Sequence, residues 1–155
     1  MVSSFDRWSY YRNQFSKMCV QGRRGVKAID ILALDPDKTA WLIEVKDYRR
    51  HRRTKPEDLA DEVSKKVFDT LAALLPAGIR ATEDREKQAA RAMLQARGLR
   101  VVLHLEQPRH PSKLFPKVCD PSLILMKLRH HLKAIDPHPV VVNIGQPGPM
   151  EWRVS

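Results

Sequence analysis

Cysteine is scarce in this sequence of 155 residues, which contains only Cys19 and Cys119. The two do not form a CxxC pair, so the sequence indicates neither a disulfide framework nor a cysteine-based zinc site. The six histidines show no HxxxH or HExxH spacing, which argues against a zinc enzyme. We therefore expect two reduced thiols and no zinc.

Long apolar runs are also absent. No stretch approaches the ~20 apolar residues that cross a bilayer, and the beginning of the chain has no apolar core of a signal peptide. GxxxxGK[ST], GxGxxG and GxSxG are missing as well, so we expect no nucleotide cofactor and no nucleophile elbow. The expectation is a cytoplasmic protein with no membrane partner.

Positive charge is what the sequence has in excess. There are 28 Lys and Arg against 18 Asp and Glu, which gives a formal net charge of +10 and a pI near 9.9. Such a domain suits a polyanion, nucleic acid first and an anionic membrane second. The length suits one domain over residues 1–155, with an irregular tail from about 145 to 155.

The pattern of apolar residues, turn signals and caps predicts eight elements. The predicted helices cover 3–18, a segment from the Thr54–Glu57 capping box to the PAG at 76–78, 83–97, and 122–135 after Asp120 and Pro121. The predicted strands cover 26–34, 40–48, 99–105 and 139–145, the first two forming a hairpin around DPDKT. This order predicts one mixed α/β domain.

The predicted hairpin carries charges inside strands that are apolar on both faces, which is typical of strands in a sheet covered by helices. A five-residue turn over 35–39 places Asp30 opposite Glu44, with Lys46 on the same face, and pairs Lys27 with Asp47. A four-residue turn would instead place Lys27 opposite the like-charged Lys46, which is unfavourable. The charges therefore favour the five-residue turn.

Two carboxylates directly opposite one another repel, and a cation between them removes the repulsion. Mg²⁺, with Mn²⁺ as a substitute, takes carboxylate oxygens and keeps several waters. Asp30 and Glu44 would hold this ion, and Lys46 would assist an attacking water. The alternative is a purely structural ion network of the same three residues.

Asp30 followed by Glu44-Val45-Lys46 resembles the active-site motif of the PD-(D/E)xK nuclease superfamily, which has the restriction-endonuclease-like fold and includes Holliday junction resolvases. The resemblance implies an αβββαβ core, a mixed central sheet flanked by helices. It also implies Asp30, Glu44 and the Val45 backbone carbonyl as metal ligands, and Lys46 as the catalytic lysine. Ile29 stands in place of the motif's proline. Many members carry a glutamate in the first helix, where this chain offers only Asp6.

A basic segment directly follows the second strand of the hairpin. Arg49, Arg50, Arg52 and Arg53, with His51 among them, are expected to hold phosphates beside the site. The alternative is a solvated basic loop. Lys65 and Lys66 fit a polar helix face better than a site.

The resulting functional expectation is a Mg²⁺-dependent endonuclease that hydrolyses phosphodiester bonds, with DNA favoured over RNA as the partner. The alternative is a catalytically inactive nuclease-fold subunit that binds nucleic acid or serves in assembly. A third hypothesis is a nuclease directed at RNA. A homodimer or larger complex is expected where specific sequences are read.

Overall fold

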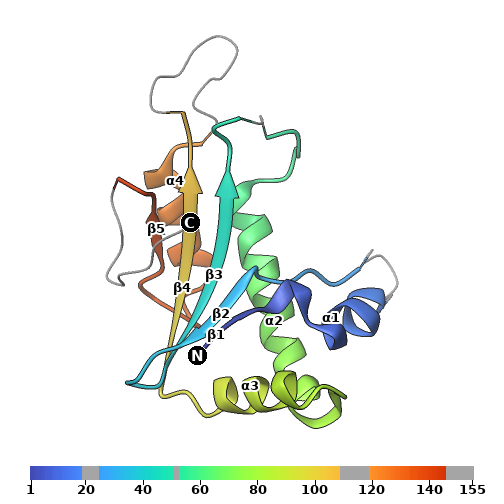
Figure 1. Ribbon diagram of the computed structural model, residues 1–155. Helices are drawn as coiled ribbons and strands as arrows, with labels where there is room; N and C mark the ends of the chain where they lie inside the picture. The colour runs from blue at the N-terminus through green and yellow to red at the C-terminus, as the bar shows by residue number, and fades with distance from the viewer. Residues whose placement is uncertain (19–24, 51–52, 109–118, 146–155) are drawn as a thin grey trace.

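The computed structural model describes residues 1–18, 25–50, 53–108 and 119–145 of the chain (Figure 1). The described strands are β1 (Val2–Ser4), β2 (Ile31–Leu34), β3 (Thr39–Asp47), β4 (Gly98–Glu106) and β5 (Val140–Val142). The described helices are α1 (Ser9–Asn13), α2 (Leu59–Arg80), α3 (Asp84–Leu94) and α4 (Pro121–His131), with 3-10 turns η1 (Phe5–Arg7) and η2 (Phe15–Lys17). The predicted α/β class is confirmed.

The five strands form one mixed sheet in the order β1-β2-β3-β4-β5. The pairs β1–β2 and β2–β3 are antiparallel, whereas β3–β4 and β4–β5 are parallel. Parallel neighbours need a crossover connection. Helices α2 and α3 lie in the connection between β3 and β4, and α4 lies in that between β4 and β5 (Figure 1).

The register of the hairpin is the predicted one. Leu32 faces Leu42 and Leu34 faces Ala40, as the five-residue turn requires. The Asp35 N–H donates to the Thr39 carbonyl at 3.1 Å, which closes the turn.

The predicted pair of Lys27 with Asp47 does not form. The strand β2 begins only at Ile31, so Lys27 lies outside the ladder. Its N–H donates instead to the Asp69 carboxylate at 3.0 Å, and Asp47 bonds the Arg49 guanidinium. The shared face with Glu44 thus extends back only as far as Asp30.

The predicted first helix over 3–18 is mostly wrong. Ser3 pairs with Leu32, so this segment begins as an edge strand and continues in short helical turns. The apolar spacing that suggested a helix still marks core residues, because Phe5, Trp8, Tyr10 and Phe15 are all buried. Phe5 and Trp8 contact each other edge to face, with ring centroids 4.8 Å apart.

Helix α2 begins later than the Thr54 capping box predicted. Its N-cap is Asp58, whose side chain accepts a hydrogen bond from the Ala60 N–H at 2.9 Å. The same carboxylate also pairs with Lys127 of α4 at 2.6 Å. Asp58 therefore both starts α2 and joins it to α4.

Helix α2 also continues through the PAG sequence that was predicted to end it. Pro76 lies inside the helix, where it removes one N–H donor. The last turn is held by α3, because the Arg91 guanidinium donates to the Gly78 carbonyl at 2.8 Å. A side chain on Gly78 would meet the Arg91 Cγ at 3.4 Å and the Leu94 Cδ1 at 3.5 Å. Close packing of α2 on α3 thus outweighs the proline.

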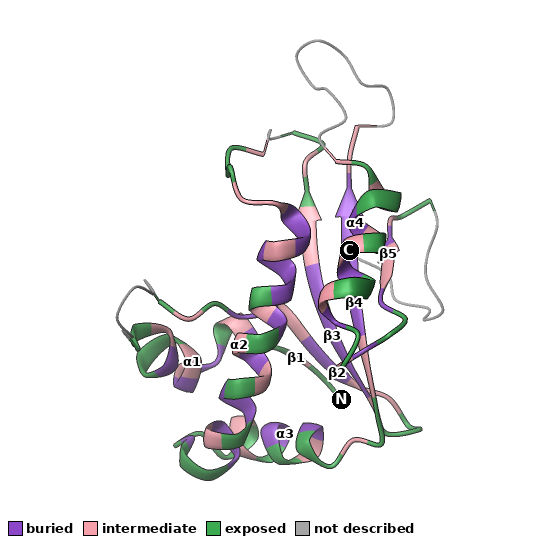
Figure 2. Ribbon diagram, turned by 180° about the vertical axis from the view of Figure 1, so that it is seen from behind, coloured by how far each residue is buried: buried purple, intermediate pink, exposed green. Residues whose placement is uncertain are grey.

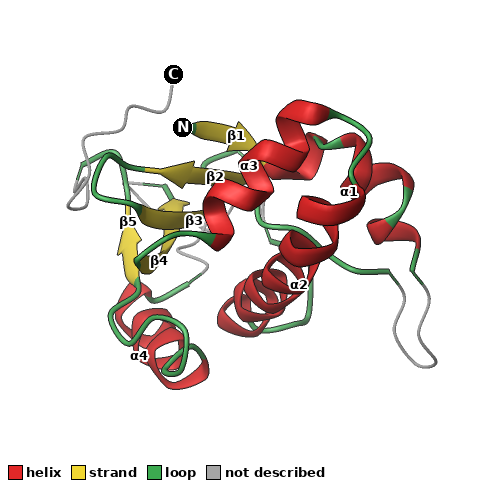
Figure 3. Cartoon of the chain, turned by 90° about the horizontal axis from the view of Figure 1, so that it is seen from below, coloured by secondary structure: helices red, strands yellow, loops and turns green. Residues whose placement is uncertain are grey.

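The described helices pack against one face of the sheet, which corrects the expectation of helices on both faces. The core on the helical face includes residues of α1, α2, α3 and α4. The core on the other face contains strand residues only, namely Ala33, Trp41, Ile43, Val102 and Val142. Figure 2 shows the buried sides of α2 and α4 turned toward the sheet, and Figure 3 shows the layers from below.

The later elements agree with prediction to within a few residues. Asp120 caps α4 by accepting from the Ser122 N–H at 2.9 Å, with Pro121 in the first turn. The predicted tail falls on residues 146–155, which lie outside the described residues. In the part of the chain that the structure describes, no helix is long and apolar enough to cross a membrane.

Candidate functional site

A cluster of carboxylates and cations lies where the C-terminal half of β3 faces α2. Alternation along the strand turns Glu44 and Lys46 toward α2. The helix contributes Glu62 and Lys66, which are four residues apart and so share one side of α2. Asp30 directly precedes β2 and, by the register, stands beside Glu44. We call these five residues the carboxylate–lysine cluster.

Lys66 lies between the two carboxylates that the hairpin brings together. Its Nζ is 2.6 Å from the Glu44 Oε1 and 3.4 Å from the Asp30 Oδ1. The Glu44 Oε2 is buried and has no hydrogen-bond partner. Burial raises the pKa of Glu44, Lys66 opposes that shift, and the Asp30 charge adds to it.

Lys46 links the strand carboxylate to the helix carboxylate. Its Nζ is 2.8 Å from the Glu44 Oε1 and 3.1 Å from the Glu62 Oε1. Burial by itself would lower the pKa of Lys46, but the carboxylates of Glu44 and Glu62 outweigh it and raise the pKa above its usual value. Lys46 is therefore firmly charged, and its proton is hard to remove near neutral pH.

Glu62 gathers cations from both ends of the β3–α2 connection. Besides Lys46, it pairs with Lys55 at 2.7 Å and with Arg53 at 2.9 Å. Burial alone would raise the pKa of Glu62, but hydrogen bonds from the three cations lower it to about 2. Because its side chain is fully buried, this carboxylate fixes the connection onto α2.

The basic segment is less free to bind phosphates than its sequence suggested. Arg53 is only 9% exposed and also donates to the Tyr48 hydroxyl, so it serves the cluster. Arg49 pairs with Asp47 at 2.6 Å but remains half exposed. Arg50 is exposed, whereas Arg52 lies outside the described residues, as does its neighbour His51.

Two other residues were predicted near the metal. The Val45 N–H donates to the Asp30 Oδ2 at 2.8 Å, and its carbonyl as a metal ligand stays a prediction. Asp6 lies in η1, and among the described residues no hydrogen bond or ion pair joins its carboxylate to Asp30 or Glu44. The structure brings together Asp30, Glu44 and Lys46, and the additional role of Asp6 stays a prediction.

The arranged residues do not fit a divalent metal. The space between Asp30 and Glu44 is bridged by the Lys66 ammonium, and Lys46 binds the same Glu44 oxygen. A divalent ion placed there would meet two cations at short range, which repel it. No group of three or more His, Cys, Asp or Glu suited to a metal occurs among the described residues. Binding of Mg²⁺ by this chain stays an untested prediction.

Sequence reasoning missed Glu62 and undervalued Lys66. Both follow the buried side of α2, where Leu59, Val63 and Val67 form the apolar stripe. A glutamate on the core-facing side of a helix is rare unless it is paired. That position was the signal that could have placed Glu62 in the cluster.

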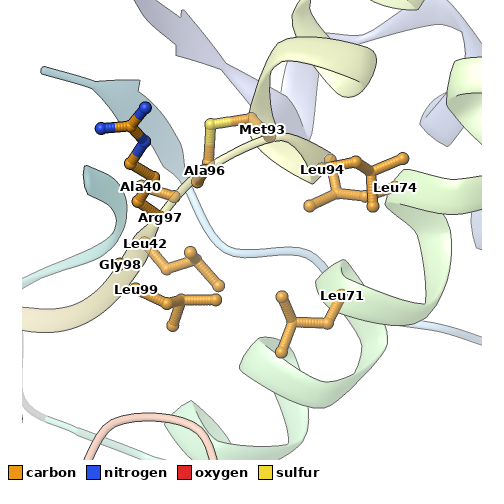
Figure 4. A pocket seen from close by; sticks show the side chains of 10 residues that line it. All are labelled: Ala40, Leu42, Leu71, Leu74, Met93, Leu94, Ala96, Arg97, Gly98 and Leu99. Atoms are coloured by element: carbon orange, nitrogen blue, oxygen red, sulfur yellow. The ribbon is translucent and has the colours of Figure 1, made fainter. Parts of the chain in front are cut away.

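An apolar hollow lies at the end of β3 away from the carboxylate–lysine cluster, between the sheet and helices α2 and α3. It has a volume of about 310 Å³. Figure 4 shows its lining, which is apolar apart from one arginine: Ala40, Leu42, Leu71, Leu74, Met93, Leu94, Ala96, Arg97, Gly98 and Leu99. It holds no group for acid–base chemistry, so it does not compete with the cluster as a reactive site.

The chain is similar to part of a known enzyme. A cysteine–tRNA ligase of Neisseria meningitidis (serogroup A, serotype 4A) is 30% identical over 151 residues, a match that covers 80% of this chain. The match covers 21% of the ligase, so the chain spans about a fifth of the length of this relative. No family model matches the chain, and no solved structure matches it.

This likeness overturns the functional prediction made from the hairpin. Asp30, Glu44 and Lys46 were expected to form the site of a metal-dependent nuclease, or of an inactive nuclease-fold subunit. The relative is named as a cysteine–tRNA ligase and not as a nuclease. The three residues do meet, but they meet as an ion-paired cluster fixed by Lys66 and Glu62.

Proposed function

We propose that this chain is an RNA-binding module whose first candidate ligand is tRNA. The observation that carries the proposal is the match of 80% of the chain to a segment of a cysteine–tRNA ligase. The expectation of DNA over RNA came with the nuclease resemblance, and charge does not separate the two polyanions. The relative favours RNA.

The charge distribution supports the proposal. The net charge of +10 matches a polyanion. Exposed cations lie beside the carboxylate–lysine cluster: Arg49 and Arg50 at the end of β3, Lys55 before α2, and Lys65 on α2. The Lys65 ammonium is 63% exposed although it contacts Glu57. Phosphates can therefore be contacted from one end of the sheet.

The proposal is binding, not aminoacylation by this chain alone. The chain spans about a fifth of the ligase's length. A module of this size adds affinity for the nucleic acid while another protein supplies the chemistry. A cytoplasmic location, and a dimer or larger complex, belong to this proposal.

We also propose the finer fold. The β2–β3 hairpin with its Asp30–Glu44 register, followed by helices and the parallel strand β4, is compatible with a restriction-endonuclease-like core and with the PD-(D/E)xK superfamily. This concerns ancestry of the backbone only and carries no claim of phosphodiester cleavage. Superposition of a crystal structure on known folds tests it.

The binding proposal is tested by fluorescence anisotropy with labelled tRNA and with duplex DNA of similar length. We expect the chain to bind tRNA more tightly than the DNA, with affinity that falls steeply between 50 and 300 mM KCl, a range chosen because phosphate contacts release counterions. The variant Arg50→Glu should weaken tRNA binding about three- to tenfold, since one phosphate contact becomes a repulsion.

The matched control is Arg85→Glu, the same charge change at an exposed position of α3. Figure 1 shows α3 at the end of the molecule opposite the arrowhead of β3. This variant should weaken binding by less than about twofold, through the long-range field alone. Equal binding of DNA and tRNA, or equal effects of the two variants, would overturn the proposal.

A further inference from the structure

The position of Lys66 relative to the two hairpin carboxylates has a consequence beyond RNA binding. Asp30 and Glu44 face one another because the turn register puts them there. The Lys66 Nζ approaches one oxygen of each, at 3.4 Å and 2.6 Å. Its side chain is only 13% exposed, so the contact is made largely away from water.

The acceptors around Lys66 are not all used. The Glu44 Oε2 is fully buried and has no partner, which is costly for a carboxylate oxygen. The Asp30 Oδ1 is reached only at 3.4 Å, longer than a good charged hydrogen bond. One ammonium therefore does not supply hydrogen bonds to all the oxygens of the two carboxylates.

We propose that the Lys66 ammonium takes the place of a divalent cation between Asp30 and Glu44, and that removing the amine opens a divalent-cation site. The lysine is a monocation tethered to α2, so it holds the pair together without any soluble ion. Once it is gone, the two facing carboxylates remain, with Lys46 on one oxygen of Glu44 and the other Glu44 oxygen buried without a partner. Those are hard donors of the kind that Mg²⁺ and Mn²⁺ take.

The test uses Lys66→Met, which keeps an apolar stem and removes the charge. Thermal unfolding and isothermal titration are carried out with Mn²⁺, with Mg²⁺, and with chelator. We expect the melting temperature of the wild type to be the same in Mn²⁺ and chelator. Lys66→Met should melt lower in chelator, regain stability in Mn²⁺, and bind Mn²⁺ at least tenfold more tightly than the wild type.

Three further variants define the site. Lys65→Met makes the same chemical change one residue earlier, at an exposed lysine paired with Glu57, and should respond to Mn²⁺ as the wild type does. Adding Asp30→Asn to Lys66→Met should abolish the gain, because it removes one of the two carboxylates. Lys66→Arg keeps the charge and should bind no metal.

If Lys66→Met does not fold in chelator, its refolding yield in Mn²⁺ becomes the measurement, and rescue supports the proposal. No rescue, or no Mn²⁺ effect on a folded variant, overturns it. Equal Mn²⁺ affinity of the wild type and Lys66→Met also overturns it, because the ion would then displace the amine. The readouts are independent of RNA, so they fail or succeed separately from the proposed function.

Discussion

The two halves of β3 bury neighbouring residues by opposite means. Leu42 and Glu44 are two residues apart on the same face, and both are fully inaccessible. Leu42 packs in hydrocarbon beside the apolar hollow, whereas Glu44 rests on ion pairs with Lys46 and Lys66. Complete burial on one strand can therefore be stabilised by apolar packing at one end and by ion pairs at the other.

The largest loss of stability is expected when one carboxylate of the charged half is removed. Glu62→Ala leaves the largely buried Arg53 without its carboxylate and leaves Lys46 with Glu44 alone. Removing one member of a buried ion pair costs about 3–5 kcal/mol. Urea unfolding should show this loss, while Glu83→Ala, at an exposed glutamate, should change the free energy of unfolding by less than about 0.5 kcal/mol. A small effect of Glu62→Ala would mean that water already reaches these cations.

A substitution in the apolar half should lower the free energy of unfolding by less, and the loss should not depend on salt. Leu42→Ala removes a fully buried side chain, which costs about 2–4 kcal/mol through lost transfer energy and cavity formation. The loss should be nearly independent of salt, because no charge is exposed. Leu75→Ala, at a leucine that is 59% exposed, is the control and should cost under about 1 kcal/mol. A salt-dependent loss in Leu42→Ala would show that the two halves are coupled.

Acid should separate contributions within the charged half. The pKa of Glu62 is lowered to about 2, so its stabilisation is present above its unfolded value near 4.3 and is lost as the pH falls toward 2. The pKa of Glu44 is raised by burial, so its contribution falls as the pH rises above about 4.3. Melting temperatures from pH 7 to 2 should show both slopes. Glu44→Gln should remove only the upper one, and an unchanged upper slope would contradict the assignment.

The smallest effect is expected at the exposed rim of the charged half. Arg49 and Asp47 form an ion pair that is about half exposed, and such pairs contribute about 0–1 kcal/mol. Asp47→Ala should therefore shift the free energy of unfolding by less than about 0.5 kcal/mol in urea titrations. A loss as large as that of Leu42→Ala would extend the buried network beyond Glu62.

The sequence predicted the hairpin well because its signals agree. Two apolar runs flank a turn rich in Asp and Pro. The five-residue turn is correct, although the Lys27–Asp47 pair used to choose it does not form. The element bounds near Thr54 and Pro76 were wrong because contacts distant in sequence decide them. Asp58 forms an ion pair with Lys127, and the Gly78 carbonyl accepts a hydrogen bond from Arg91. Neither partner is evident from the local sequence pattern.

The candidate site was predicted in position but not in chemistry. Asp30, Glu44 and Lys46 meet as the alternation of strand residues requires. Their partners come from α2, where Glu62 and Lys66 follow the apolar stripe of the helix, a signal that the sequence prediction did not use. Lys66 and Glu62 convert a pair of carboxylates that seemed to need a metal into a cluster already supplied with cations. The nuclease prediction depended on those cations being absent.

The mixed sheet has a consequence for how the chain acquires its fold. The β2–β3 hairpin is local, because its strands are joined by a short turn. The parallel ladder of β3 with β4 brings Thr39 next to Gly98 across the whole α2–α3 connection, and closing a long loop costs entropy before its contacts form. The hairpin is therefore expected to form early and to present a half-built sheet edge, along β3, that stays unpaired until α2 and α3 have docked.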